Sequence, residues 1–177
     1  MKNQNDLRNK KYKSGIIITL VIIVIFLVCI FSIFDSVKVV GPSMNPNFNG
    51  ENGIYDKVII SRIYEINYGD VIVFKNDDLK ENLIKRVVGV EGDTIAIKDN
   101  KLYRNGDEVI EDYICEPMKL VQFNGKSWKI EKGQVFVLGD NRNNSTDSRE
   151  LGPISKKDIL GEVVIRIDNA TGKIHFM

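Results

Sequence analysis

Ser43 is a candidate nucleophile because of its type, its neighbours and its place in the chain. It lies in the segment Gly41-Pro42-Ser43-Met44-Asn45-Pro46, nine residues beyond an uncharged apolar run from Gly15 to Phe34. Glycine and proline restrict the backbone around this hydroxyl, which is tethered near a segment that suits a bilayer. The chain contains one histidine, His175. We therefore expect a base other than histidine to take the proton of Ser43.

Lysine can act as that base only when it is neutral. Lowering its pKa from about 10.4 to about 8 by desolvation costs roughly 3 kcal/mol, so the right lysine should lie among apolar neighbours. Lys85 meets this condition in the predicted strand Leu83 to Val90. Side chains alternate between the two faces of a strand, which puts Lys85 on one face with Leu83 and Val87. Lys85 is the candidate general base.

The same alternation puts Arg86 on the opposite face with Ile84 and Val88. Alternation therefore does not decide which cation has a catalytic role, but a guanidinium stays protonated and cannot serve as a base. A strand with one exposed cation and one paired cation, neither of them catalytic, is the alternative interpretation.

A polar segment after the predicted strand Gln134 to Leu138 is a candidate functional loop. Gly139-Asp140 opens it, and hydrogen-bonding side chains continue to Arg149. A core strand that runs into so many polar side chains is more typical of a functional loop than of a plain connection. A calcium-binding loop does not fit, because the EF-hand positions three, six and twelve hold Arg142, Ser145 and Leu151. We expect no metal and no cofactor.

The apolar run from Gly15 to Phe34 predicts a single transmembrane helix, since 20 residues rise about 30 Å. The residues before it include the single acid Asp6 and five cations: Lys2, Arg8, Lys10, Lys11 and Lys13. From Asp35 to Asn49, after the run, the only charged residues are Asp35 and Lys38. The positive-inside rule then predicts a cytoplasmic basic segment over residues 1–14, an anchor over 15–34 in the cell membrane, and an extracytoplasmic part over 35–177.

Two other readings of the apolar run fit less well. A cleaved signal peptide would have a shorter apolar core and small residues at the cleavage site, but this run ends with the bulky residues Ile30, Phe31, Ile33 and Phe34. A lipoprotein signal would place a small residue before Cys29, where Val28 stands.

The remaining 143 residues predict one all-β domain with antiparallel connections. Short β-branched runs recur between turn residues: Lys57 to Ser61, Val71 to Phe74, Leu83 to Val90, Thr94 to Ile97, Gln134 to Leu138 and Gly161 to Ile167. Lys98 to Lys101 and Arg104 to Asp107 are predicted hairpin turns. The 25 lysines and arginines balance 24 acids, so no nucleic-acid partner is expected. Cys29 and Cys115 lie in different environments and predict no disulfide.

Three segments, taken in their order along the chain, resemble the motifs of bacterial type I signal peptidases. They are Gly41 to Pro46, which contains Ser43; Leu83 to Asp93, which contains Lys85; and Gly139 to Gly152, which is the polar loop. The resemblance implies a Ser-Lys dyad, with Ser43 attacking the scissile carbonyl and neutral Lys85 taking its proton. It also implies that Ser145 hydrogen-bonds and orients the Lys85 amine. Two ion pairs would brace the loop, Asp147 with Arg149 and Asp140 with Arg86, and Arg142 would join this scaffold in an unspecified role.

The resemblance extends to fold and substrate. It implies antiparallel sheets that form a partly open, barrel-like catalytic domain, with residues 98–132 as a small inserted β-rich subregion. The substrates would be signal-peptide-bearing preproteins, cut after small residues of the Ala-x-Ala type and bound as an extended strand beside membrane lipid. Shallow apolar pockets near Met44, Leu83 and Ile84 would select the small side chains. Some members of the family carry a serine where this chain has Gly41, so the backbone N–H of Ser43 would carry more of the oxyanion stabilisation.

Two further hypotheses remain. Self-cleaving repressors resemble the same catalytic fold, but they carry a DNA-binding domain where this chain has an apolar run. A non-catalytic, membrane-tethered β domain that binds partners would leave Ser43 and Lys85 incidental.

Overall fold

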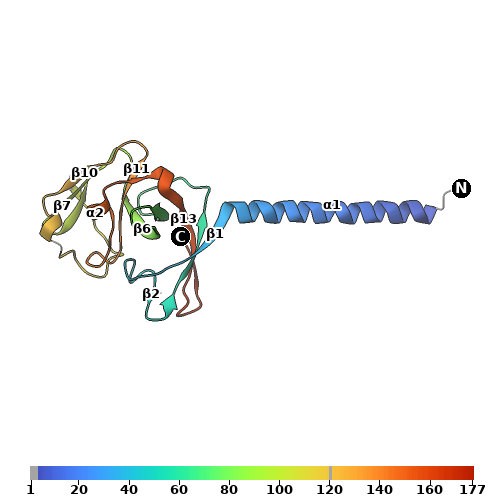
Figure 1. Cartoon of the computed structure of the whole chain (residues 1–177), viewed down its shortest axis with the longest axis horizontal. Helices are drawn as coiled ribbons and strands as arrows, with labels where there is room; N and C mark the ends of the chain where they lie inside the picture. Colours follow the sequence, from blue (N-terminus) through green and yellow to red (C-terminus); the bar gives the residue numbers. More distant parts are fainter. Residues whose placement is uncertain (1–3, 120) are drawn as a thin grey trace. The chain divides into compact units, whose positions relative to one another are not determined.

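The computed structural model describes residues 4–119 and 121–177. Two units make up the chain, one ending at Asp35 and the other running from Ser36 to Met177 (Figure 1). Lys2 of the predicted basic segment lies outside the described residues, as do the side chains of Arg8, Lys10 and Lys11.

The first unit is built on the long helix α1 (Gln4–Ile33). This helix includes the apolar run and continues back through the basic segment. Its stretch Tyr12–Ile33 has a mean hydropathy of 3.5 and is not buried by the rest of the chain. The hydroxyls of Thr19 and Ser32 donate to the carbonyls of Gly15 and Val28 one turn earlier. Both groups are thus satisfied inside the helix, as an apolar surrounding requires.

The second unit is mostly β, and its larger sheet has eight strands in the order β1-β4-β13-β5-β6-β11-β12, with β14 paired to β13. The strands are β1 (Phe34–Lys38), β4 (Lys57–Ser61), β5 (Val71–Asn76), β6 (Glu81–Gly89), β11 (Gln134–Leu138), β12 (Ile154–Ser155), β13 (Ile159–Ile167) and β14 (Ile174–Phe176). The registers from β4 to β12 are antiparallel, which confirms the predicted class. The sheet does not close into a barrel, because β1 and β12 end it and do not pair with each other.

The second sheet has the order β10-β7-β8-β9. Its strands are β7 (Thr94–Lys98), β8 (Lys101–Arg104), β9 (Asp107–Glu108) and β10 (Ser127–Lys129). Both predicted hairpin turns are confirmed, since Lys98 pairs with Lys101 and Arg104 pairs with Asp107. The residues between these pairs have positive φ, as type I′ turns require. A third, two-stranded sheet joins β2 (Gly50–Glu51) to β3 (Ile54–Tyr55).

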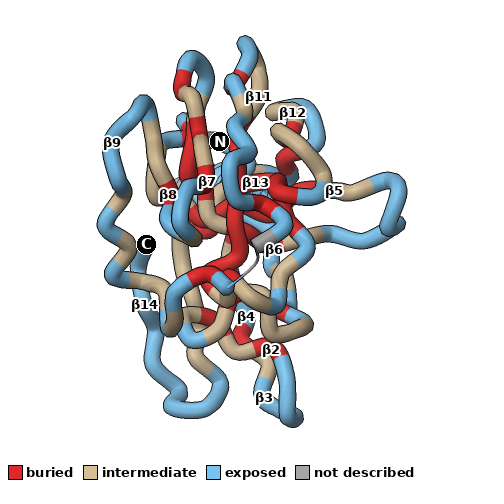
Figure 2. The backbone as a smooth tube through the Cα atoms, turned by 90° about the vertical axis from the view of Figure 1, so that its left-hand side faces the viewer, coloured by how far each residue is buried: buried red, intermediate tan, exposed pale blue. Residues whose placement is uncertain are grey.

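Helical turns in this unit are short: α2 (Ser148–Leu151), η1 (Val121–Phe123) and η2 (Lys156–Asp158). The core lies where the larger sheet is covered on both faces, and strand β5 is buried over its first four residues. Figure 2 shows the buried positions gathered around β6 and β13, with the tips of the hairpins exposed. The larger sheet therefore positions two of the predicted site elements: Lys85 stands on β6, and the polar loop follows β11.

Candidate active site

Ser43 and Lys85 meet in the structure. Lys85 Nζ donates a hydrogen bond to Ser43 Oγ at 2.8 Å, and a second one to the backbone carbonyl of Ile84 at 2.8 Å. The Lys85 side chain is 2% exposed, whereas Ser43 is partly open to solvent. Strand β6 buries the amine, and the Ser43 hydroxyl stands at the surface above it.

Burial lowers the pKa of Lys85 to about 8, and the nearby carboxylates of Asp147 and Asp140 oppose this by favouring the ammonium. Desolvation has the larger effect because the strand face around Lys85 is apolar. A substantial fraction of the amine is therefore neutral at mildly alkaline pH, with a lone pair that can accept a proton.

A tight turn carries Ser43. Gly41 has φ of 89°, a conformation that other residues rarely adopt, and its N–H donates to the carbonyl of Gly50 at 2.7 Å. A Cβ on Gly50 would lie 2.3 Å from the Gly41 carbonyl oxygen, so only glycine allows the two backbones to approach this closely. These two glycines close the segment that holds the hydroxyl.

The polar loop after β11 fixes the same turn from the other side. The N–H of Asn141 donates to the Ser43 carbonyl at 3.0 Å, and its side-chain amide donates to the Pro42 carbonyl at 3.2 Å. Gly139 packs directly against this contact, since a Cβ there would lie 2.5 Å from the Ser43 carbonyl oxygen. The backbone of Ser43 is thus held by hydrogen bonds to residues that are distant in sequence.

Both ion pairs implied by the resemblance are present and bidentate. Arg86 donates from Nε and Nη2 to the two oxygens of Asp140, at 2.8 and 2.7 Å. Arg149 does the same to Asp147, with both distances 2.8 Å. Asp147 also accepts from the N–H of Gly139 at 3.0 Å and caps helix α2. The loop is consequently braced by buried charge pairs with matched geometry.

Arg142, whose role the sequence left open, is fully buried and pairs through Nη1 with Glu111. Its Nε donates to the Gly139 carbonyl at 3.0 Å. Tyr113 completes the cluster: its hydroxyl donates to Glu111 at 2.7 Å, and its ring lies under the guanidinium of Arg86. Sequence reasoning missed Glu111 and Tyr113, which stand in a region without a recognisable motif.

Asn47 was also missed. Its side-chain amide donates to the Tyr113 carbonyl at 2.6 Å and to Asp140 at 2.9 Å. It therefore joins the turn after Ser43 to the ion pair of Asp140 with Arg86. A polar residue four positions after a candidate nucleophile carried no signal of its own.

The expected hydrogen bond between Ser145 and Lys85 is not formed. Ser145 Oγ is buried and has no hydrogen-bond partner among the described residues, and Lys85 Nζ instead donates to Ser43 and Ile84. Ser145 does lie against the site, since a Cβ on Gly139 would meet its Oγ at 2.2 Å. The two hydrogen bonds of the amine therefore go to Ser43 and to the Ile84 carbonyl, and the orienting role of Ser145 stays a prediction.

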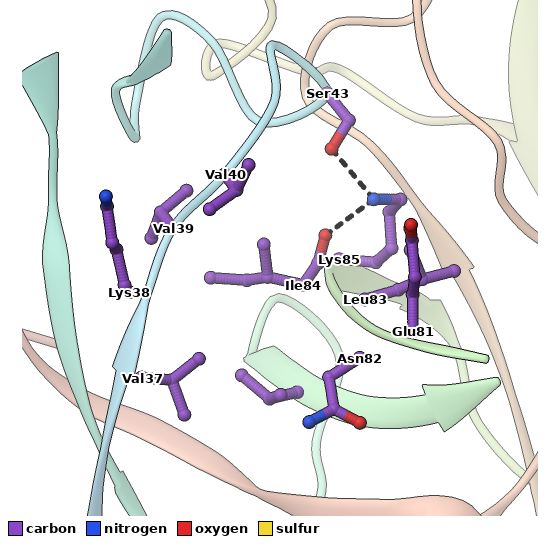
Figure 3. A pocket seen from close by; sticks show the side chains of 11 residues that line it. Val37, Lys38, Val39, Val40, Ser43, Glu81, Asn82, Leu83, Ile84 and Lys85 are labelled. Atoms are coloured by element: carbon purple, nitrogen blue, oxygen red, sulfur yellow. Dashed lines mark hydrogen bonds between the residues drawn. The ribbon is translucent and has the colours of Figure 1, made fainter. Parts of the chain in front are cut away.

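A groove of about 400 Å³ begins at the dyad and is lined by both predicted pocket residues of β6, Leu83 and Ile84. Figure 3 shows Val37, Val39 and Val40 along one wall and the residues of β6 opposite them, with Ser43 at the upper edge. Residues 81–85 of β6 pair with β5 on one edge, while β11 pairs only with residues 86–89. The other edge of this stretch has no strand partner among the described residues.

Met44 does not line this groove, which corrects the sequence-based expectation. It is fully buried and packs in the core with Val39 and Phe48. The N–H of Phe48 donates to the carbonyl of Met44, so the chain turns here in a helical manner and directs both side chains inward. The expectation followed from the resemblance, which did not include the direction in which this turn points its side chains.

A family model and several known proteins match most of this chain. The model of the family "Signal peptidase, peptidase S26" matches residues 12–167. Signal peptidase I V of Bacillus subtilis is 39% identical over 144 residues, which cover 75% of this chain and 84% of the relative. Signal peptidase I P of Bacillus subtilis subsp. natto is 34% identical over 167 residues, which cover 87% of this chain and 90% of the relative.

A crystal structure of a signal peptidase I from Enterococcus faecalis V583 aligns with 56% of this chain and 97% of its own, at 28% identity and a TM-score of 0.46. The sequence matches alone decide the family. Because the family model spans the apolar helix, the dyad and the polar loop, this chain belongs to the signal peptidase family, peptidase S26.

Proposed function

We propose that this chain is a membrane-anchored endopeptidase that removes signal peptides from exported preproteins, with Ser43 as nucleophile and Lys85 as general base. The observation that carries the proposal is the 2.8 Å hydrogen bond between Lys85 Nζ and Ser43 Oγ, at an amine whose pKa burial lowers to about 8. A neutral amine at this distance is within reach of the hydroxyl proton.

The reaction needs Lys85 in its neutral form, in which Ser43 donates the hydrogen bond. Ser43 Oγ attacks the scissile carbonyl carbon while Lys85 Nζ takes the hydroxyl proton. When the C–N bond breaks, Lys85 gives that proton to the leaving amine, and an acyl ester remains on Ser43. Water then attacks the ester with Lys85 again as base, and Ser43 recovers its proton. The Ser43 N–H is the nearest candidate to stabilise the oxyanion, since Gly41 provides no hydroxyl.

The groove suits an extended peptide. The free edge of Glu81–Lys85 offers backbone hydrogen bonds to an added strand. Leu83 and Ile84, with the valines of the opposite wall, form a shallow apolar surface beside the dyad. Such a surface favours small side chains before the scissile bond, as in the Ala-x-Ala sequence. The remaining loop residues act indirectly: Asp140, Arg86, Asp147, Arg149 and Arg142 hold the turn of Ser43 and the strand of Lys85 in place.

Position at the membrane supports the same function. Helix α1 has the length and composition of a single span, and the cations before it favour a cytoplasmic N-terminus and an extracytoplasmic catalytic unit. Anchoring the enzyme in the bilayer that holds its substrate raises their effective concentration. Membrane-impermeant maleimide tests the orientation: in a Cys29→Ser variant, the exposed Cys115 should react in intact protoplasts. Labelling that requires lysis would place the catalytic unit inside.

Neither alternative from the sequence is favoured. The family match includes residues 12–167, so the apolar helix lies within the matched family pattern. A domain that only binds partners gives no reason for an amine buried at a serine hydroxyl.

The deciding experiment is cleavage of a preprotein with an Ala-x-Ala site by the full chain in detergent micelles. Ser43→Ala and Lys85→Ala should each abolish cleavage. Ser127→Ala and Lys132→Ala are matched controls at exposed positions outside the site, and both should keep wild-type rates. Substantial turnover by Lys85→Ala would contradict the assigned base, and turnover by Ser43→Ala would contradict the nucleophile.

A further inference from the structure

Two hollows meet at the dyad. The first is the groove between residues 37–40 and β6, and the second has a volume of about 410 Å³. Both are lined by Ser43, Leu83 and Lys85, and they share no other residue. The second hollow therefore adjoins the dyad and is open to a peptide that crosses Ser43 from the first groove.

The second hollow differs from the first in its chemistry. The first groove is walled largely by valine, leucine and isoleucine. Besides the three shared residues, the second is lined by one proline and by six polar or charged residues: Gln122, Asn143, Asn144, Ser145, Thr146 and Glu150. These come from the polar loop, from α2 and from η1. This surface offers hydrogen bonds rather than apolar contacts.

Glu150 is the charged residue that distinguishes this hollow. Its side chain is exposed, and it forms no ion pair or hydrogen bond with another side chain among the described residues. The neighbouring Arg149 is committed to Asp147, and Arg86 to Asp140. The negative charge of Glu150 is therefore available to a bound peptide.

We propose that the second hollow binds the first residues after the scissile bond, and that Glu150 gives the enzyme a preference for cationic over acidic residues there. This inference rests on the proposed function. Small apolar residues before the cut would occupy the first groove, which leaves the second hollow to the start of the mature protein. A lysine there is attracted by Glu150, and a glutamate is repelled by it. Because the charge is exposed, the effect is modest and screened by salt.

The test uses three preproteins with one Ala-x-Ala site and with lysine, glutamine or glutamate at the second and third residues after it. The measured quantity is the ratio of kcat/KM for the lysine substrate to that for the glutamate substrate, at low ionic strength and pH 9. Taking a ratio within each variant cancels any change in overall activity. We expect a wild-type ratio of about three to ten, the effect of one or two exposed ion pairs.

Variants of Glu150 then test whether its charge causes the preference. Glu150→Gln should bring the ratio close to one, and Glu150→Lys should invert it. Glu65→Gln is the matched control, an exposed glutamate that lines neither hollow, and it should keep the wild-type ratio. A wild-type ratio near one, or an unchanged ratio in Glu150→Gln, would overturn this inference. If either of these results is found while the glutamine substrate is still cleaved, the proposed function stands and only the inference about Glu150 fails. If none of the three substrates is cleaved, both the proposed function and this inference fail.

Discussion

Lys85 and Ser43 are 42 positions apart in the chain, yet the amine of one lies 2.8 Å from the hydroxyl of the other. This contact joins a rigid strand to a turn that glycines close, and the amine is almost completely buried. The pair's chemistry should therefore depend on the protonation of a single group.

The first prediction concerns the pH dependence of cleavage. Because the pKa of Lys85 is lowered to about 8, the amine is mostly protonated below pH 8 and mostly neutral above it. We expect kcat/KM to fall about tenfold for each pH unit below 8 and to level off above it, as for a single required base. Initial rates between pH 6 and pH 10, on a substrate without titratable groups near the cut, measure this. A flat profile from pH 6 to pH 9 would rule out Lys85 as the base.

The second prediction concerns stability. The folded state holds Lys85 at a lower pKa than the unfolded state, so burying the ammonium opposes folding. This penalty is fully present below about pH 8, shrinks as pH rises from 8 to 10.5, and vanishes above. At neutral pH it amounts to about 3 kcal/mol, at 1.36 kcal/mol for each pKa unit. Replacing Lys85 by methionine, which has a similar shape and no charge, would remove this penalty.

Lys85→Met should therefore be inactive but more stable at pH 7, by about 1 kcal/mol. The gain is smaller than the full penalty because the variant loses the hydrogen bonds to Ser43 and Ile84, each worth about 1 kcal/mol. Denaturant unfolding of the catalytic unit in the full chain, followed by tryptophan fluorescence at pH 7 and pH 10, measures the difference. A variant that is less stable than wild type at pH 7, or a difference independent of pH, would contradict this origin of the lowered pKa.

Local patterns predicted the longer strands of the core but not the edge strands β1, β12 and β14, and they did not predict the contacts that hold the site. β4 and β11 match their expected ranges because β-branched residues and flanking turns determine both. Glu111 and Asn47 were missed because they act on partners 31 and 93 positions away. The Met44 assignment was wrong because the direction of a side chain in a turn follows from its hydrogen bonds. Lys85 could be singled out as the candidate base because the chain has one histidine, because a guanidinium stays protonated, and because apolar residues flank this lysine on its strand.

The third prediction tests the turn that holds Ser43. Gly50→Ala would bring a Cβ to 2.3 Å from the Gly41 carbonyl oxygen, a backbone atom that cannot move without shifting the turn. Misplacing a nucleophile by about 1 Å can cost on the order of 100-fold in rate. We expect kcat to fall by about that factor with little change in KM, since the groove itself is lined by other residues.

Gly15→Ala is the control, because a Cβ there meets nothing within 4 Å. It should keep wild-type kcat in the same assay. Wild-type kcat in Gly50→Ala would show that the close approach of the two glycines is not needed to position Ser43.

The fourth prediction concerns the ion pair of Asp147 with Arg149, whose side chains are each 1% exposed. Asp147→Asn leaves the Arg149 guanidinium buried without its counter-charge, and breaking such a pair typically costs about 3–5 kcal/mol in the free energy of unfolding.

The exposed pair of Lys101 with Glu108 provides the contrast, with side chains 56% and 45% exposed. Glu108→Gln should change the free energy of unfolding by less than about 1 kcal/mol. Denaturant unfolding of both variants at pH 7 measures the difference, and equal effects would show that burial does not strengthen the loop's ion pair. Because Asp147 also accepts the N–H of Gly139, which packs against the Ser43 carbonyl, Asp147→Asn should lower kcat as well.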